Sequence, residues 1–311
     1  MVFPVAPGRP NFSGTFIPEI WSGKVIKNFY DATVLTAISN TDYEGEIRKY
    51  GDTVNIRTMP EVTLRRYTKG DKLVVETPEA PKIQLLIDKS WYFQVNVDDV
   101  DKVQMDLPLL NYYTQSYGEQ VKINIDRDVL HGILPDVDPT NRGATAGAKT
   151  QSFNLGTTAS PITLSKDGAG STVPVIDFIV DCGVVLDENN IPDDGSWYMV
   201  IPAKMAGIIK KSELKDASLT GDSQSPLRNG RIGRIDRFTL YTSHNLKVES
   251  NGAFNILFGH KYGLTFATQM TNTETIRAES TFGSLVRGLV VYGYKVVKPT
   301  CIGRAVALLQ N

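Results

Sequence analysis

The chain has 311 residues, enough for two subdomains with sizeable hydrophobic cores, and its 33 Lys and Arg residues nearly balance 34 Asp and Glu residues. The net charge is only −1, and neither a signal-peptide pattern nor an 18-residue apolar run occurs. These features argue against a dedicated nucleic-acid-binding protein, a secreted protein and a membrane protein. Two cysteines, Cys182 and Cys301, are too few for a disulfide framework and favour a protein made in a reducing cytoplasm.

The N-terminal region, residues 1–46, is predicted to be an extended arm followed by a short helix. Residues 1–14 are rich in Pro and Gly and have no hydrophobic period. Residues 16–39 have the apolar spacing of a short helix. An arm that leads into a small helix usually docks on another element or subunit. Three arm residues are therefore predicted to lie at a subunit interface: Phe12, Phe16 and Trp21.

Residues 47–98 are predicted to form an extended β-hairpin. Apolar and polar residues alternate around Ile56 and again from Ile83 to Val97, which is the strand pattern. Between these stretches lies a charged turn that contains glycine. Since so long a hairpin is not stable alone, we expect its tip to contact a neighbouring subunit. The predicted interface residues of the tip are Arg65, Arg66, Tyr67 and Lys69.

A long helix is predicted over residues 106–134, within a segment spanning residues 99–173. Eight apolar residues recur there in steps of three and four, the one-face pattern of an amphipathic helix: Leu107, Leu110, Tyr113, Tyr117, Val121, Ile125, Val129 and Ile133. Asp106 is placed to cap the N-terminus, while Gly132 and Pro135 mark the end. At about 1.5 Å per residue, this helix would be long enough to serve as the spine on which sheets are mounted.

The remaining chain predicts loops and then a mixed α/β portion. Residues 135–172 are rich in Gly, Thr and Ser, so loops and short strands are expected there. Residues 174–187 are predicted to form a helix, and residues 197–202 a buried strand. Residues 203–218 are predicted to form a helix and a loop. A turn with a short helix is predicted at residues 271–287. Residues 287–311 close the chain with two strand candidates.

Residue patterns for chemistry are mostly absent. The three histidines, His131, His244 and His260, lack the HExxH and CxxC spacings of metal sites and are interpreted as structural. Asp136, Asp138 and Asn141 resemble only a fragment of a calcium loop, because the required Gly and terminal Glu spacing is absent. We therefore expect no catalytic, cofactor-binding or metal-binding residues and no enzyme activity.

Two C-terminal stretches carry a resemblance to a known family. One reads NGRIGRIDRF from Asn229 to Phe238 and continues TLYTSHNL. The other reads FGHKYGLTFATQM from Phe258 to Met270 and leads into ETIRAESTFGSLVRGLVVYGYKVVKP. Together with the order of elements, they resemble the HK97-type major capsid proteins of tailed bacteriophages, podovirus-like members in particular. One departure is the Asp-Arg pair before Phe238, where such proteins often have a glycine.

This resemblance implies an α+β, HK97-like capsid fold. Residues 1–46 would form its N-terminal arm and residues 47–98 its extended hairpin, the E-loop. Residues 99–173 would form the P-domain with the spine helix, and residues 174–286 the mixed α/β A-domain. The return strands at 287–311 would belong to the P-domain.

The resemblance also implies a function and partners. The chain would assemble as hexamers and pentamers into the icosahedral capsid of the virion and would enclose double-stranded DNA without sequence-specific binding. A separate scaffolding protein, a portal and a cement protein would be its other partners. Assembly would take place in the host cytoplasm, with no cofactor and no membrane involved.

Three alternatives remain open from the sequence. An encapsulin-like nanocompartment shell has the same fold but holds enzymes. A soluble α+β enzyme would use Asp98, Asp99 and Asp101, or the loop with Asp136 and Asp138, as an acid or metal site. A tail or decoration protein would assemble without forming the shell, although the long helix argues against that class.

Overall fold

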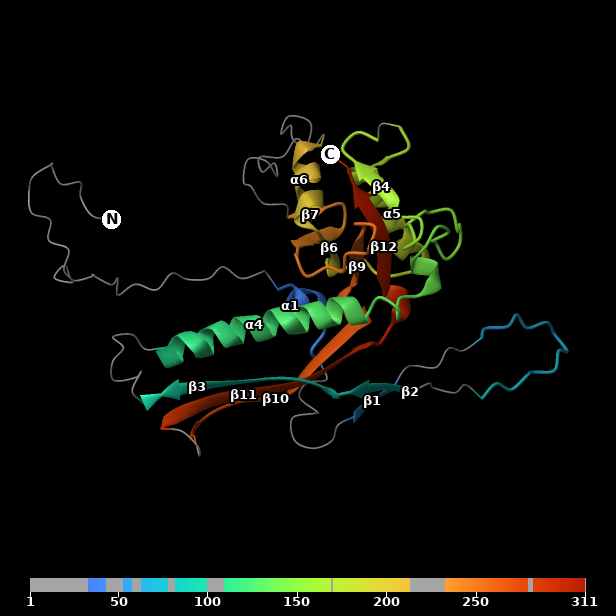
Figure 1. Cartoon of the computed structure of the whole chain (residues 1–311). Coiled ribbons are helices and arrows are strands. Elements are labelled where there is room, and N and C mark those ends of the chain that lie inside the picture. The colour runs from blue at the N-terminus through green and yellow to red at the C-terminus, as the bar shows by residue number, and fades with distance from the viewer. Residues whose placement is uncertain are drawn as a thin grey trace, which may run out of the picture.

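The structure of the protein, a computed structural model, contains two sheets of different size that are connected through a long helix (Figure 1). The structure describes residues 33–42, 53–57, 63–77, 82–99, 109–168, 170–212, 233–278 and 282–310. The predicted arm residues Phe12, Phe16 and Trp21, and the predicted helix cap Asp106, lie outside these ranges.

The smaller sheet carries the long helix on one face. Its three antiparallel strands are, in spatial order, β10 (Leu264–Arg277), β11 (Gly283–Val296) and β3 (Lys89–Asp98). Because side chains alternate across a strand, every second residue of β3 faces the helix α4 (Leu109–Gly132). On that face the ring of Phe93 stacks on Tyr117 of α4, with centroids 3.5 Å apart.

Helix α4 confirms the predicted spine helix within the described residues. The predicted apolar face is buried in its C-terminal half, at Val121, Ile125 and Val129. Tyr113 was predicted on the same face but is exposed. The reason is that the N-terminal half of α4 lies along the smaller sheet alone, whereas its C-terminal half also packs against residues of the larger sheet (Figure 1).

The larger sheet has seven strands in the order β5–β4–β12–β9–β6–β8–β7. Their bounds, in that order, are Val173–Pro174, Ile162–Ser165, Ile302–Leu309, Phe254–His260, Trp197–Ile201, Phe238–Thr242 and Arg234–Ile235. Helices α5 (Val175–Glu188) and α6 (Ala203–Lys211) pack on one face of this sheet. Strand β6 is buried along its whole length, which explains its unbroken apolar sequence. The helices predicted near residues 174 and 203 and the buried strand are thus confirmed.

The opposite face of the larger sheet meets the C-terminal half of α4. Tyr198 and Leu257 share a buried core there with Leu130 of the helix. The short helix α1 (Leu35–Ile38) joins the same core. Within the described residues, short 3-10 helices lie in the connections: η1 (Pro139–Asn141), η3 (Lys261–Gly263) and η4 (Pro299–Cys301).

Two short strands, β1 (Thr53–Arg57) and β2 (Lys82–Leu86), pair antiparallel at the base of a projecting loop. They pack on the face of the smaller sheet that α4 leaves open, in a small core that contains Leu85 and Ala267. A Cβ on Gly293 of β11 would lie 2.1 Å from the Leu86 carbonyl oxygen. Only glycine therefore permits this close approach of β2 to the sheet.

Three sequence-based expectations differ from the structure. Residues 47–98 are not one hairpin, because β3 leaves it and pairs with β11, where its apolar side chains face α4. Residues 271–277 continue β10 and residues 283–287 begin β11, so the short helix predicted there is wrong. The two C-terminal strands exist, but β11 belongs to the smaller sheet and β12 to the larger one.

Candidate subunit interface

The loop 63–77 projects from the body and is shaped by its own polar contacts (Figure 1). Arg65 Nη2 lies 2.9 Å from Glu76 Oε1 across the loop. At the tip, the Asp71 N–H donates to the Thr68 carbonyl and the Thr68 N–H donates to Asp71 Oδ2, both at 3.0 Å. An exposed ion pair contributes little free energy, so these contacts orient the loop more than they stabilise the fold.

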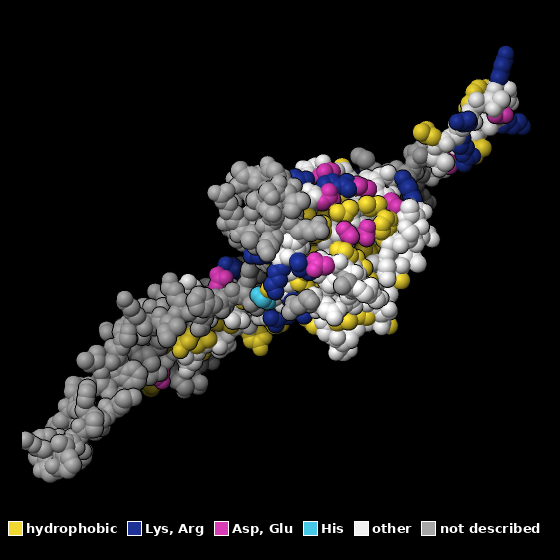
Figure 2. All heavy atoms as spheres, turned by 90° about the horizontal axis from the view of Figure 1, so that it is seen from above, with side chains coloured by type: hydrophobic (Ala, Val, Ile, Leu, Met, Phe, Trp, Pro, Cys, Tyr) yellow, Lys and Arg dark blue, Asp and Glu magenta, His cyan; other side chains and the backbone are white. Residues whose placement is uncertain are grey.

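Large apolar side chains of the loop 63–77 are exposed to solvent. The exposed fractions are 96% for Leu64, 81% for Leu73 and 90% for Val75, and Tyr67 and Val74 are also exposed. Figure 2 shows the projecting loop with hydrophobic and Lys or Arg side chains next to each other along it. Such a concentration of bare apolar surface marks a contact site for another molecule.

All four predicted tip residues lie on this loop. Arg65, Arg66, Tyr67 and Lys69 are exposed. Their charges marked them in the sequence, whereas the apolar side chains on the returning half of the loop were not predicted to lie at the interface. The signal was present, because the run Leu73-Val74-Val75 is too apolar for a solvated turn between Lys72 and Glu76.

A second exposed surface lies on the smaller sheet, on the face opposite α4 and beyond the part that β1 and β2 cover. Tyr92 of β3 is 80% exposed there and borders a groove of about 310 Å³ with Leu289 of β11. Arg287 and Glu274 form an ion pair of 2.8 Å in the same groove. Hydrogen bonds from Arg287 and then Asn272 lower the pKa of the Glu274 carboxyl, which favours its charged form.

Comparisons with known proteins show the family. A model of a family described as phage capsid protein matches residues 87–306. The chain belongs to the phage capsid protein family. A structure from Mycobacterium phage Che8 is 26% identical, with a TM-score of 0.76, and the match covers 96% of this chain and 98% of that one. No curated protein sequence gives a significant match.

Two more distant structures have the same fold as this capsid protein. The capsid of cyanophage P-SCSP1u is 14% identical with a TM-score of 0.70, covering 95% of this chain and 94% of that one. The mature capsid of bacteriophage PhiM1 is 16% identical with a TM-score of 0.65, covering 95% and 92%. The predicted HK97-like capsid fold and the predicted role as a major capsid protein of a phage head are confirmed, and the nanocompartment alternative is not favoured.

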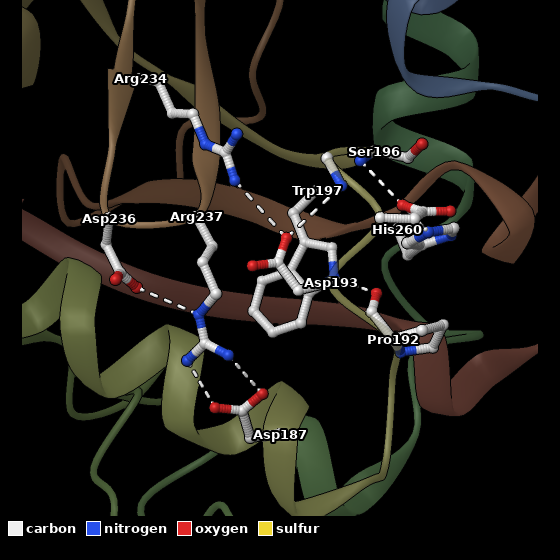
Figure 3. Close-up of polar contacts among 11 residues, drawn as sticks. Asp187, Pro192, Asp193, Ser196, Trp197, Arg234, Asp236, Arg237 and His260 are labelled. Carbon is white, nitrogen blue, oxygen red and sulfur yellow. Dashed lines mark hydrogen bonds and ion pairs between the residues drawn. The ribbon is translucent and has the colours of Figure 1, made fainter.

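The larger sheet of the capsid protein contains a polar cluster that fixes the turn between β7 and β8 (Figure 3). Arg237 makes a two-pronged ion pair with Asp187 at the end of α5 and lies 4.7 Å from the centre of the Trp197 ring. Its pKa is raised, first by the hydrogen bond from Arg237 to Asp187. Asp236, in the Asp-Arg pair before Phe238, adopts a φ of 52°. This is the left-handed conformation that glycine favours and that an aspartate tolerates.

Two of the three histidines, His131 and His260, make ordinary structural contacts, and His244 is exposed. His260 is buried and its Nε2 lies 2.9 Å from Asp194 Oδ1, while its Nδ1 accepts a hydrogen bond from the Tyr262 N–H. The hydrogen bond between His260 and Asp194 is the main cause that lowers the pKa of the Asp194 carboxyl. His131 Nε2 donates to the Asn245 carbonyl, and burial is the main cause that lowers the pKa of His131.

Three acidic residues of the enzyme alternative are held in structural contacts, whereas Asp101 lies outside the described residues. Asp99 pairs with Arg277 at 2.8 Å, and Asp136 lies 3.5 Å from Lys295. Asp138 accepts hydrogen bonds from Thr140. In the parts of the chain that the structure describes, no group of three metal-binding side chains occurs, and no helix has the length and apolarity to cross a membrane.

Proposed function

We propose that the chain forms an icosahedral head from hexamers and pentamers in which the loop 63–77 of each copy docks on a neighbouring copy. The exposed apolar side chains of this loop carry the proposal. Burying one of them fully is worth about 1.5–3 kcal/mol, and each copy offers several. These side chains do not stabilise a free subunit while they are exposed to water. Contact with the surface of a second protein would bury them.

The groove beside Tyr92 is the receiving surface that we infer. In Figure 1 the loop 63–77 points away from one end of the smaller sheet, while the sheet extends toward the opposite side. A loop from one copy would therefore reach the open sheet face of the next copy in a head-to-tail contact. Head-to-tail contacts form rings when the rotation between copies closes, which is the geometry that hexamers and pentamers need.

The remaining parts of the proposal follow from the family. The head would enclose double-stranded DNA, and a net charge of −1 limits repulsion among many packed copies. A separate scaffolding protein, a portal and a cement protein would be the partners, and assembly would occur in the host cytoplasm. The arm residues Phe12, Phe16 and Trp21 would make a second contact between copies.

The test compares Val75→Ser on the loop with Val248→Ser, the same change at an exposed valine on the body. The loop variant should keep the unfolding free energy of the wild type but need about tenfold more protein to form closed particles, since ~1.4 kcal/mol of contact energy is lost per copy. The Val248 variant should assemble as the wild type does. Sedimentation and electron microscopy of the particles provide the measurement, and equal assembly of both variants would contradict the proposed docking.

A further inference from the structure

A pocket of about 350 Å³ beside strand β12 brings two arginines together, Arg142 and Arg304. Ala305 and Ala307 of β12 lie in the core beneath α5 and α6. Because side chains alternate along a strand, Arg304 faces the other side of the sheet, where the pocket lies. A Cβ on Gly156 would lie 2.3 Å from the Val306 carbonyl oxygen, so the pocket wall depends on a residue without a side chain.

Arg304 is held in one orientation by its neighbours. Its Nε donates to Asn255 Oδ1 at 2.8 Å, and its Nη2 donates to Thr158 Oγ1 at 3.2 Å and lies 3.5 Å from Glu249 Oε1. Asn255 is fully buried, and its Nδ2 donates to Glu249 Oε1 and to the Lys247 carbonyl, both at 3.0 Å. The buried amide thus fixes both the arginine and its acidic partner, as a preorganised binding site requires.

Arg142 lies next to Arg304, and repulsion between their like charges is unfavourable. The two residues form a parallel β-bridge, so their like charges are adjacent on paired backbones. Burial and, to a smaller extent, the charge of Arg142 lower the pKa of Arg304, while Glu249 raises it. Within the described residues, Arg142 has no carboxylate at ion-pair distance and donates only to the Pro135 carbonyl, at 3.2 Å.

The charges around the pocket do not balance. Lys247 and Arg304 share one carboxylate, Glu249, at 3.5 Å each, and Arg142 has no carboxylate at ion-pair distance among the described residues. Hydrogen bonding from Asn255 is the main cause that lowers the pKa of Glu249, so this carboxylate is already charged and cannot supply more compensation. Among the side chains of Arg142, Lys247, Arg304 and Glu249, the positive charges therefore exceed the negative ones by two. A ligand with about two negative charges would neutralise them.

We propose that Arg142 and Arg304 bind a phosphate-type oxyanion in this pocket. A planar guanidinium offers parallel N–H donors that match the oxygen pairs of phosphate, and two of them neutralise a doubly charged group. Thr158 adds a hydroxyl at the rim. The phosphate comes either from free inorganic phosphate or from the backbone of a nucleic acid. The site is independent of the proposed docking of the loop 63–77.

The test measures binding of inorganic phosphate to the full chain by titration calorimetry. The variant is Arg142→Gln, and the control is Arg127→Gln, the same charge change at an exposed position on α4. Loss of a charge-assisted hydrogen bond predicts a fall in affinity of about tenfold or more for Arg142→Gln and no change for Arg127→Gln. Arg142→Lys keeps the positive charge but loses the parallel N–H donors of the guanidinium, so it should give an intermediate affinity. Absence of binding to the wild type, or equal binding by the Arg142→Gln and Arg127→Gln variants, would overturn the proposal.

A second titration separates the two sources of phosphate. A short DNA duplex is added to the wild type in the presence of phosphate. Displacement of phosphate by the duplex, lost in Arg142→Gln, supports the site and assigns it to the nucleic-acid backbone. Phosphate binding that depends on Arg142 but is unaffected by the duplex supports the site and assigns it to the free ion.

Discussion

Asp126 shows how a single buried carboxylate can join distant parts of the chain. It lies on α4 with no exposed surface, and its Oδ1 accepts hydrogen bonds from the N–H groups of Val34 and Leu35 at 3.0 and 2.9 Å. Its Oδ2 accepts one from Asn245 Nδ2 at 2.8 Å. These partners lie more than 90 residues away in both directions. Asp126 therefore fixes α1, and the start of the described chain, to the long helix.

Replacing Asp126 with alanine should destabilise the subunit by roughly 3 kcal/mol, because buried donors that lose their acceptor cost about 1–3 kcal/mol each. Asp126→Asn should cost much less. Its oxygen can still accept the two N–H groups, and its amide can donate to Asn245 Oδ1, a buried atom without a hydrogen-bond partner among the described residues, once the Asn245 amide turns over. Urea denaturation measures both values. Similar losses in the two variants would show that shape rather than hydrogen bonding matters here.

At the scale of elements, the smaller sheet is packed on both faces, and glycine makes this possible. One face carries α4, and the other receives β1 and β2 at the base of the loop. Gly293 lies where β2 crosses β11, and a side chain there would meet the Leu86 carbonyl. The position of the loop 63–77 therefore depends on a residue in another element.

Gly293→Ala should destabilise the subunit by about 1–3 kcal/mol, because the added methyl group would collide with backbone rather than with a flexible side chain. Gly118→Ala is the matched control. A Cβ at this position of α4 has no neighbour within 4 Å, so alanine should stabilise the helix by about 0.5–1 kcal/mol. Thermal unfolding should show a lower melting temperature for Gly293→Ala and a higher one for Gly118→Ala. Shifts in the same direction would mean that the contact with the Leu86 carbonyl does not decide the effect.

The sequence predicted elements best where the hydrophobic period was long. The spacing of Val121, Ile125 and Val129 predicted the long helix, and the unbroken run of β6 predicted a strand buried on both faces. The pairing of β3 with β11 could not be predicted, because alternation reports that a strand has two faces but not which strand lies beside it. The exposed run from Leu73 to Val75 was also missed. In a sequence, an apolar residue that binds another molecule cannot be told from an apolar residue of the core.

For the molecule as a whole, several carboxylates make the free energy of unfolding depend on pH in the acid range. Hydrogen bonds from neighbouring groups lower the pKa values of Glu188, Asp194, Glu249 and Glu274. Asp181 acts in the opposite direction, because burial and then the charge of Asp177 raise its pKa. A lowered folded-state pKa means that the unfolded chain binds protons first, so the stabilisation exists above the unfolded value and is lost as the pH falls through the folded one.

Glu249 is the best place to measure this dependence, because its side chain is only 12% exposed and joins Lys247, Arg304 and Asn255. Glu249→Gln should be clearly less stable than the wild type at pH 7. Below pH 4.5, the ordinary value for a glutamate, the unfolded chain takes up a proton at this residue before the folded protein does, so the difference should shrink as the pH falls through the lower folded pKa. Glu119→Gln, at an exposed pair on α4, is the control and should show a small difference at neutral pH. Urea denaturation of the three proteins from pH 7 to pH 3 measures the effect, and a gap that stays constant with pH would mean that Glu249 acts through packing and not through its charge.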